Sequence, residues 1–277
     1  MDTNEIWHVI DADLATLLSA WNHTGPCFVE ASNETITFGK YVKGLDADSA
    51  EDLGFVFDIE NGFRFSRSRI ECVYARVESC HDAIPPTIEM DFSGLPHGLR
   101  IVELPGPNGR SKSSFQNLIS LLSNRIISWD ELDSRRDIIR EERPLCPCCE
   151  EKAKSRVEYA SLHPLFDILL YASHEKRSLR FEVIDKAVEM EGTFVVEEVF
   201  VSDGSILVSG ESGLYHARIN MRWVHALAIH ERATDGFPYA NLSVYDSHGI
   251  ERFRISSGIP DDAVRWANIC EEAKRYF

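Results

Sequence analysis

The sequence lacks the features that most directly assign a protein to a membrane or to nucleic acid. None of its apolar runs is long enough to cross a membrane. Positive charge is scarce, with 29 Lys and Arg against 45 Asp and Glu and a net charge of −16. Proteins that bind nucleic acid or an anionic membrane generally present a basic face. We therefore expect no nucleic-acid partner and no membrane insertion, although a local basic pocket is compatible with this composition.

Common catalytic signatures are also missing. The sequence has no nucleophile elbow, no phosphate-binding glycine loop and no His-Glu-x-x-His zinc motif. Its start, MDTNEIWHVIDADLATLL, is acidic where a secretory leader is basic, so we expect a cytoplasmic protein. The seven cysteines are then expected to be free thiols, as is usual in a reducing compartment.

What the sequence does contain is enough apolar side chains for a packed core, and a pattern of short strands. Hydrophobic residues make up 44% of the chain. Between residues 53 and 104, short apolar runs alternate with turn residues, which is typical of an antiparallel meander. We expect residues 1–24 and the stretch after residue 109 to be helical, and the acidic residues 45–53 to be a solvated linker.

The second half of the chain repeats the order of elements predicted for the first. Strands separated by glycine turns run from residue 194 to residue 255, and a final helix contains Trp266. In the alignment of the two halves, Gly98 pairs with Gly249. We therefore predict an α+β protein with a tandem duplication, each half an antiparallel β-sheet flanked by helices. The predicted boundaries are 1–125 for the first repeat, 126–157 for a charged connection, and 158–277 for the second repeat.

Residues 161–182, SLHPLFDILLYASHEKRSLRFE, predict an amphipathic helix, a turn and the start of a second helix. Apolar residues recur there at three- and four-residue spacing. Pro164 suits a first helical turn, and Ser161 is expected to be the N-cap. His163 lies between them, on or beside the apolar face.

This stretch resembles the start of the second half of the HemS/HmuS family of cytoplasmic haem-utilisation proteins. The family has a pattern close to D-V-H-x-F-F-x-L-L-x-x-H-x-x-x-R there. Residues 208–216 and 223–249 are also similar to family segments. The resemblance implies a HemS-like fold, haem as the cofactor, and a role in haem utilisation or iron transport. The residues that match the first pattern are His163, Phe166, Leu169, Leu170, His174 and Arg177 or Arg180.

The resemblance also implies a binding site. The family's histidine is the axial ligand of the haem iron, which implies that His163 ligates iron and that Phe166 contributes to the cofactor site. Alternatively, His163 is a helix-terminal histidine that caps the helix locally. Candidate cations for the haem propionates are Arg177, Arg180 and Arg222.

In the family, an arginine of the first half faces the iron from the opposite side. The family's Thr-Arg-Asn element has no arginine counterpart here, where the sequence reads Ala31-Ser32-Asn33-Glu34. This absence leaves the opposing residue unassigned. The first-half arginines on predicted strands, none of which matches a motif, are Arg64, Arg67, Arg69, Arg76 and Arg100.

A second candidate site is the cluster Leu145-Cys146-Pro147-Cys148-Cys149. Close cysteines bind zinc or copper, and Cys-Pro dipeptides can ligate haem through the thiolate. A structural zinc site usually takes four donors in C-x₂-C pairs, and the sequence has no second pair. An exposed reduced cluster, a metal or haem-transfer site, and a redox role therefore all stay open.

These observations favour a cytoplasmic haem-binding protein for haem trafficking, storage or utilisation, with haem or a related tetrapyrrole as its partner. One alternative is a HemS-like fold without haem that acts as a binding or regulatory protein. Another is a metal-trafficking protein built on Cys146, Cys148 and Cys149. The resemblance leaves haem degradation open as an enzymatic activity, and the sequence leaves a homodimer open.

Overall fold

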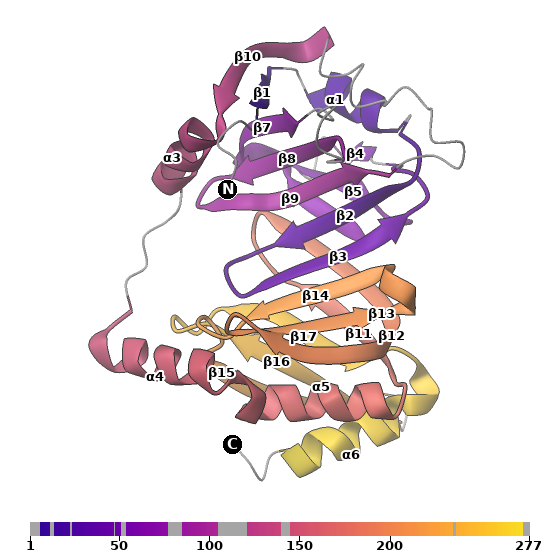
Figure 1. Ribbon diagram of the computed structural model, residues 1–277. Coiled ribbons are helices and arrows are strands. Elements are labelled where there is room, and N and C mark those ends of the chain that lie inside the picture. The colour runs from indigo at the N-terminus through magenta and orange to yellow at the C-terminus, as the bar shows by residue number, and fades with distance from the viewer. Residues whose placement is uncertain are drawn as a thin grey trace. The chain divides into compact units, whose positions relative to one another are not determined.

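The computed structural model describes residues 6–11, 14–22, 24–46, 48–50, 54–76, 85–104, 121–139, 145–234 and 237–273. They form an α+β fold in which antiparallel strands predominate, divided into two compact units (Figure 1). Each unit includes a short segment from the other half of the sequence. Unit 1 comprises Met1–Ala31, Tyr41–Glu142 and Lys186–Glu189, and unit 2 comprises Ser32–Lys40, Arg143–Asp185 and Met190–Phe277.

Unit 1 is built on antiparallel strands, which pair in two series. The first series is, in order of pairing, β10 (Ser123–Ser128), β1 (Ile6–Ile10), β7 (Ile70–Arg76), β8 (Thr87–Phe92), β9 (Leu95–Glu103) and β2 (Cys27–Ser32). The second series is β4 (Asp48–Ala50), β5 (Phe55–Asp58) and β6 (Phe63–Ser66). The helical elements are α1 (Leu14–Trp21), α3 (Trp129–Ile139) and the 3₁₀ turn η2 (Arg67–Arg69).

Unit 2 also has two antiparallel series, and both use the long strand β12 (Val188–Ser202). The later part of β12 pairs with β13 (Ser205–Gly210), followed by β14 (Tyr215–Asn220) and residues 36–40 of β3 (Ile36–Val42). The earlier part pairs with β11 (Ser178–Val183), followed by β17 (Glu251–Ser257), β16 (Phe237–Tyr245) and β15 (Ala226–Thr234). The helical elements are α4 (Pro147–Glu158), η3 (Ala160–Leu162), α5 (Pro164–His174), η4 (Glu211–Gly213), η5 (Pro260–Asp262) and α6 (Ala263–Ala273).

Large aromatic side chains fill the interior of both units. In unit 1, the rings of Trp21 and Phe65 are completely buried and their centroids lie 6.0 Å apart. In unit 2, Phe194 stacks between Phe181 and Tyr215, with centroids 5.1 Å away on each side. Burial of one such phenylalanine contributes about 1.5–3 kcal/mol. Each unit therefore has a core of its own.

The predicted meanders are present. β7, β8 and β9 are successive antiparallel neighbours in unit 1, as are β15, β16 and β17 in unit 2. Positive φ values at Gly204 (67°) and Gly249 (74°) form the predicted turns, and glycine adopts them without a Cβ clash. The α+β class is confirmed. We predict that the two meanders arose by a tandem duplication with the boundaries given above, and this stays a prediction.

Three local predictions are wrong. Residues 6–10, expected to be helical, form β1, which hydrogen-bonds to β7 and β10. Residues 48–50 of the expected linker form β4. The expected second helix after residue 174 is the strand β11, because Leu179, Phe181 and Val183 are buried and alternate with less buried residues. A period of two is the pattern of a strand.

The expected charged connection, residues 126–157, consists largely of regular structure. It contains the end of β10, all of α3 and most of α4. Helix α3 packs against β1, β9 and β10 in unit 1. The helix predicted after residue 109 lies mostly outside the described residues. Among the helices that the structure describes, none is long and apolar enough to span a membrane.

Candidate functional site

His163 is the N-cap of helix α5. Proline disfavours the helical conformation in the residue before it, and His163 is accordingly extended, with φ −79° and ψ 137°. Pro164 begins the helix, and Nδ1 of His163 accepts a hydrogen bond from the backbone N–H of Leu165 at 3.2 Å. Ser161 lies in the preceding turn η3. The prediction that Ser161 is the N-cap is therefore wrong.

The imidazole of His163 is half-buried and neutral at pH 7. Burial, assisted by the positive charge of Arg156, lowers its pKa to about 4. Because Nδ1 accepts the Leu165 N–H, the neutral ring carries its proton on Nε2. A neutral imidazole is a common metal ligand, but here the lone pair of Nδ1 accepts the hydrogen bond that caps the helix. The local capping role that the sequence left open is therefore present.

Arg156 is a site residue that sequence reasoning missed. It lies near the end of α4, where Nε and Nη2 donate to the backbone carbonyls of Met221 and Arg222, each at 3.2 Å. These carbonyls bind the guanidinium without cancelling its charge, and that charge acts on His163. No sequence motif marks Arg156, because its partners follow 65 and 66 residues later. Within the sequence near Arg156, only its position on the same helix as Cys149 indicates that it could belong to a site.

Phe166 lies beside His163 in the first turn of α5. Its backbone N–H donates to the carbonyl of His163 at 2.8 Å. The ring is only half-buried, so part of it is accessible. The fully buried face of the helix is formed by Leu165, Ile168, Leu169, Ala172 and Ser173.

Of the three candidate propionate cations, Arg222 has the most direct link to His163. Its backbone carbonyl binds Arg156, which in turn faces His163. Its guanidinium donates to Glu150 at 2.9 Å and lies over the ring of Trp223, 5.5 Å from the centroid. Arg222 thus joins the start of α4 to the turn that follows β14.

Arg177 and Arg180 lie elsewhere in unit 2. Arg177 follows the opposite end of α5 from His163, and this 11-residue helix is about 16 Å long. Arg180 lies on β11. The structure therefore does not gather these two arginines with His163. Their carboxylate partners are Glu175 and Asp262 for Arg177, and Glu182 and Glu191 for Arg180.

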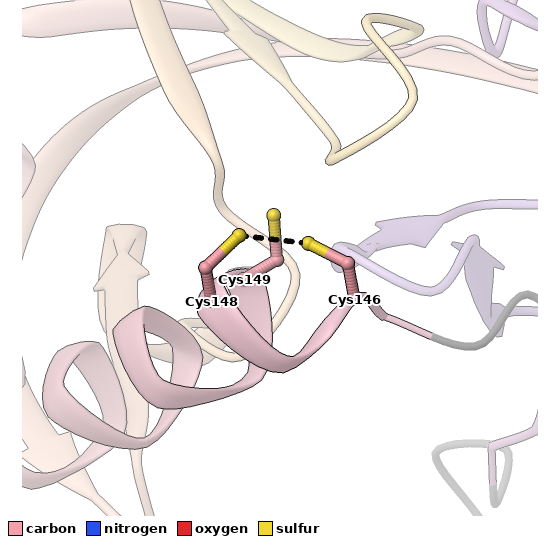
Figure 2. A group of neighbouring side chains, drawn as sticks. All are labelled: Cys146, Cys148 and Cys149. Atoms are coloured by element: carbon pink, nitrogen blue, oxygen red, sulfur yellow. Dashed lines mark hydrogen bonds between the residues drawn. The ribbon is translucent and has the colours of Figure 1, made fainter.

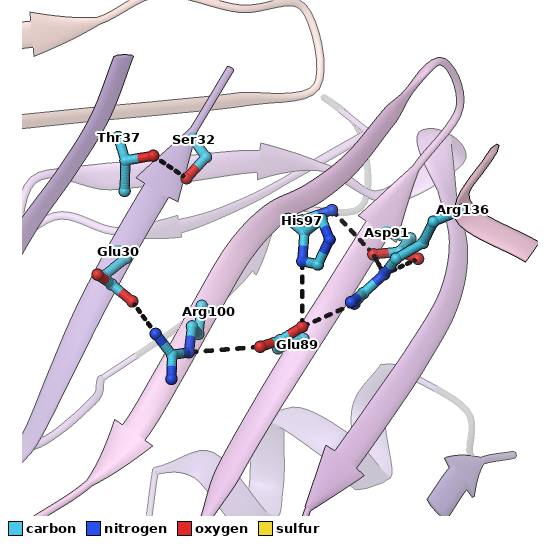
Figure 3. A network of polar contacts seen from close by, with 8 residues as sticks. All are labelled: Glu30, Ser32, Thr37, Glu89, Asp91, His97, Arg100 and Arg136. Carbon is cyan, nitrogen blue, oxygen red and sulfur yellow. Dashed lines mark hydrogen bonds and ion pairs between the residues drawn. The ribbon is translucent and has the colours of Figure 1, made fainter. Parts of the chain in front are cut away.

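Two first-half arginines are engaged by carboxylates within unit 1. Arg64 binds Glu189 through Nη2 at 2.6 Å. Arg100 binds Glu30 at 3.0 Å and Glu89 at 3.3 Å (Figure 3). The contacts of the first-half arginines named above do not indicate which of them would face an iron.

Arg100 belongs to a larger ionic network on β8 and β9 (Figure 3). At its centre, Arg136 of α3 is completely buried. Its Nε donates to Asp91 at 2.9 Å and its Nη2 to Glu89 at 2.7 Å. His97 lies 3.3 Å from Glu89 through Nδ1. Sequence reasoning missed this network, because its charges come from separate parts of the chain.

The predicted cysteine cluster is assembled at the start of α4 (Figure 2). Cys146 is the N-cap residue, Pro147 takes the first helical position, and Cys148 and Cys149 complete the turn. The three sulfur atoms lie within 4.8 Å of one another, and those of Cys146 and Cys148 are 2.9 Å apart. Cys146 and Cys148 are exposed, and Cys149 is half-buried. Metal binding by the cluster stays a prediction.

The pKa values of Cys146 and Cys149 are shifted in opposite directions. Hydrogen bonding from Cys148, then from the backbone of Cys149, lowers the pKa of Cys146 to about 7. The interaction with Cys146 raises the pKa of Cys149 to about 11. At neutral pH the thiolate of Cys146 therefore forms readily, and Cys149 remains protonated unless a cation replaces its proton.

No family model and no curated protein matches the chain. Solved structures match it over nearly its whole length. Holo-PhuS, a heme-binding protein from Pseudomonas aeruginosa, is 12% identical with a TM-score of 0.66, over 95% of this chain and 86% of that one. ChuS, a heme degrading enzyme of Escherichia coli O157:H7, is 11% identical with a TM-score of 0.68, over 98% and 87%. This chain has a HemS/ChuS-like fold.

The HemS-like fold confirms the architecture that the sequence resemblance implied. At 11–12% identity, the likeness concerns the fold alone. Any site must be argued from this chain's own residues. Two such groups lie in the helices of unit 2 that precede β11: His163 with its neighbours, and the cysteine cluster.

Proposed function

We propose that this protein binds haem and that His163 is an axial ligand of the iron. The proposal rests on one coincidence. A HemS-like fold, which the heme-binding protein PhuS also has, occurs here with an uncharged, half-buried imidazole at the start of α5. The role we propose for this binding is trafficking, storage or utilisation of haem in the cytoplasm.

The residues around His163 include a suitable ligand for the haem iron and some of the positive charge that the propionates need. Bound haem would supply an iron centre, for which a neutral imidazole is a common ligand. The accessible part of the Phe166 ring suits an apolar porphyrin, and Arg156 and Arg222 supply positive charge. Arg177 and Arg180 remain candidates for a propionate only if each gives up two carboxylate partners.

Iron ligation would cost the protein its helix cap. Bonding through Nδ1 displaces the Leu165 N–H, and bonding through Nε2 requires a proton on Nδ1, which then no longer accepts. Loss of an N-cap costs about 1 kcal/mol, whereas micromolar affinity corresponds to about 8 kcal/mol. The cap is therefore a small obstacle to haem binding.

The ion pair of Arg222 is also a small obstacle. The side chains of Arg222 and Glu150 are 40% and 32% exposed, and ion pairs of this kind contribute about 0–1 kcal/mol. A propionate offers the same carboxylate chemistry as Glu150. Arg222 can therefore exchange one carboxylate for the other at little cost.

Haemin titration of the purified protein tests this proposal with three histidine variants of α5. His163→Ala removes the imidazole and the cap. His163→Asn removes the imidazole but supplies a good N-cap. His174→Ala, the matched control, removes an exposed histidine at the other end of the same helix.

We expect saturable binding with a shifted Soret band in the wild type and in His174→Ala. Both His163 variants should lose the wild-type Soret position and bind about tenfold more weakly or worse, which is about 1.4 kcal/mol. Only His163→Ala should also lose about 1 kcal/mol of unfolding free energy. Oxygen and a reductant are then added to the complex. Progressive loss of the Soret band would indicate haem degradation.

A cysteine-ligated haem must be distinguished from a histidine-ligated one. The triple variant Cys146→Ser, Cys148→Ser, Cys149→Ser should keep the wild-type Soret spectrum. If this variant loses the band and His163→Asn retains it, the assignment of His163 is wrong and the thiols are the iron ligands.

The capping of α5 by His163 favours one second candidate function, a HemS-like fold that no longer binds haem. In that case the protein acts as a binding or regulatory module, and Nδ1 has a purely structural use. The same titration separates the two functions. Absence of saturable haemin binding by the folded wild-type protein would support the haem-free function.

A further inference from the structure

The cysteine cluster at the start of α4 has the geometry of a metal site. A metal ion bonded at about 2.3 Å to each of three sulfurs holds those sulfurs roughly 4 Å apart. The sulfurs of Cys146, Cys148 and Cys149 already lie within 4.8 Å of one another (Figure 2). The sulfurs of Cys146 and Cys148, which lie 2.9 Å apart, would have to separate by about 1 Å to reach this spacing.

The number of ligands decides which metal fits. Among the described residues, the group that meets the geometry of a metal site consists of these three cysteines alone. Structural zinc is almost always four-coordinate, so the group is one donor short for zinc. Cuprous copper is softer, prefers thiolates, and is stable with three of them.

The local backbone holds the three sulfurs together. Pro147 fixes the first helical position, which places Cys146 in an extended N-cap conformation with φ −65° and ψ 157°. Cys148 and Cys149 then point from the first turn toward the same side as Cys146 (Figure 2). The ligands are therefore preorganised by four consecutive residues, independently of any other part of the fold.

The charges around the cluster also suit an anionic complex. One cuprous ion with three thiolates carries a net charge of −2. The N–H groups in the first turn of the 12-residue helix α4, which point out of the helix, present partial positive charge to it. Arg156, two turns further along the helix, interacts electrostatically with Cys149. Glu150, the nearest acidic residue in sequence, is neutralised by Arg222.

We propose that Cys146, Cys148 and Cys149 form a three-thiolate binding site for one cuprous ion. Each thiol that binds gives up its proton to solvent, and copper stays in the +1 state, so that no oxidant or reductant is consumed. Two of the ligands are exposed. The site is therefore accessible to a donor or acceptor of the ion, which suits transfer better than permanent storage.

Anaerobic competition with the cuprous complex of bicinchoninate tests this site in the haem-free, fully reduced chain. We expect the protein to take one copper ion per chain from the chelator. Each single Cys→Ser variant should bind about tenfold more weakly or worse, and the triple variant should take none. Because these positions are exposed or half-buried, and serine is a good N-cap, the variants should keep the wild-type circular dichroism spectrum.

Cys72→Ser is the matched control, since Cys72 is a half-buried cysteine of unit 1 outside the cluster. It should bind copper like the wild type. The proposal is wrong if the triple variant still takes copper, or if one of the three cysteines can be replaced without loss of affinity. It is equally wrong if a parallel competition with a zinc chelator shows one tightly bound zinc and no cuprous binding. Neither haem nor His163 enters this test, so its outcome is independent of the proposed haem site.

Discussion

Arginines of the two units are held in ion pairs of similar length but opposite environment. In unit 1, Arg136 is completely buried and binds Asp91 at 2.9 Å and Glu89 at 2.7 Å (Figure 3). In unit 2, Arg222 is 40% exposed and binds Glu150, itself 32% exposed, at 2.9 Å. The ion-pair distances are therefore alike, but the two sites differ in their exposure to solvent, and Arg136 binds a second carboxylate.

This difference separates structural arginines from those available to a ligand. Removing one partner of a buried ion pair leaves a charge without compensation, which costs about 3–5 kcal/mol, whereas a surface pair contributes about 0–1 kcal/mol. Arg136 therefore cannot leave its carboxylates without damage to unit 1. Arg222 can leave Glu150 for another anion. Binding of a haem propionate at the proposed site requires this exchange.

Arg136→Met should produce the largest effect. The substitution keeps most of the side-chain volume, but it leaves Asp91 buried without its cation and removes one of the partners of Glu89. We expect the free energy of unfolding to fall by about 3–5 kcal/mol. Urea unfolding followed by tryptophan fluorescence measures this, because Arg136 lies 5.9 Å from the ring centroid of Trp7.

The neighbouring substitution Arg135→Met is the control. Arg135 is 33% exposed and binds Glu131 on the same helix at 3.1 Å. Its replacement should change the free energy of unfolding by less than about 1 kcal/mol. If the two substitutions lowered the free energy of unfolding equally, burial would not explain the importance of Arg136 for stability.

A smaller effect is expected from pH through Glu89. Burial alone would raise the pKa of this carboxyl, but the hydrogen bond to His97 and the charge of Arg136 outweigh it and lower the pKa to about 2. Because the ordinary value is 4.5, the folded state favours the charged form. Stability from Glu89 is therefore complete above pH 4.5 and is lost as the pH falls toward 2, by about 2 kcal/mol at pH 3.

Glu89→Gln checks this pH dependence. The variant should be less stable than the wild type at pH 7, and the difference should shrink by about 2 kcal/mol between pH 7 and pH 3, as measured by urea unfolding. A Glu89→Gln protein with the wild-type slope would contradict the role assigned to this carboxyl.

The parts of the fold that were predictable are those set by local patterns. Alternating apolar residues and glycine turns predict the meanders, because side-chain period and turn conformation are properties of short segments. The helix predicted at β11 is wrong although Leu179, Phe181 and Val183 alternate with less buried residues. The basic residues directly after α5 favour a helix locally, but the segment pairs with β12 and β17 as a strand.

The candidate sites divide in the same way. The cysteine cluster was predictable, because its three cysteines lie within four consecutive residues. The position of His163 was predictable from its pattern, but the use of Nδ1 as a cap depends on the atomic geometry of Leu165. The network around Arg136 was not predictable, since Asp91 and Glu89 lie 45 and 47 residues away in sequence. Nothing local in α3 distinguishes Arg136 from Arg135.

The smallest effect is expected at Arg222. If its ion pair with Glu150 is exchangeable, Arg222→Ala should change the free energy of unfolding by less than about 1 kcal/mol. The same variant should raise the dissociation constant for haemin about three- to fivefold, because one propionate loses its cation. Arg218→Ala is the control, since Arg218 is an exposed arginine of β14 that bonds to a hydroxyl and should affect neither quantity. A loss of stability like that of Arg136→Met, or an unchanged haemin affinity, would show that Arg222 is a structural residue and that the propionates bind elsewhere.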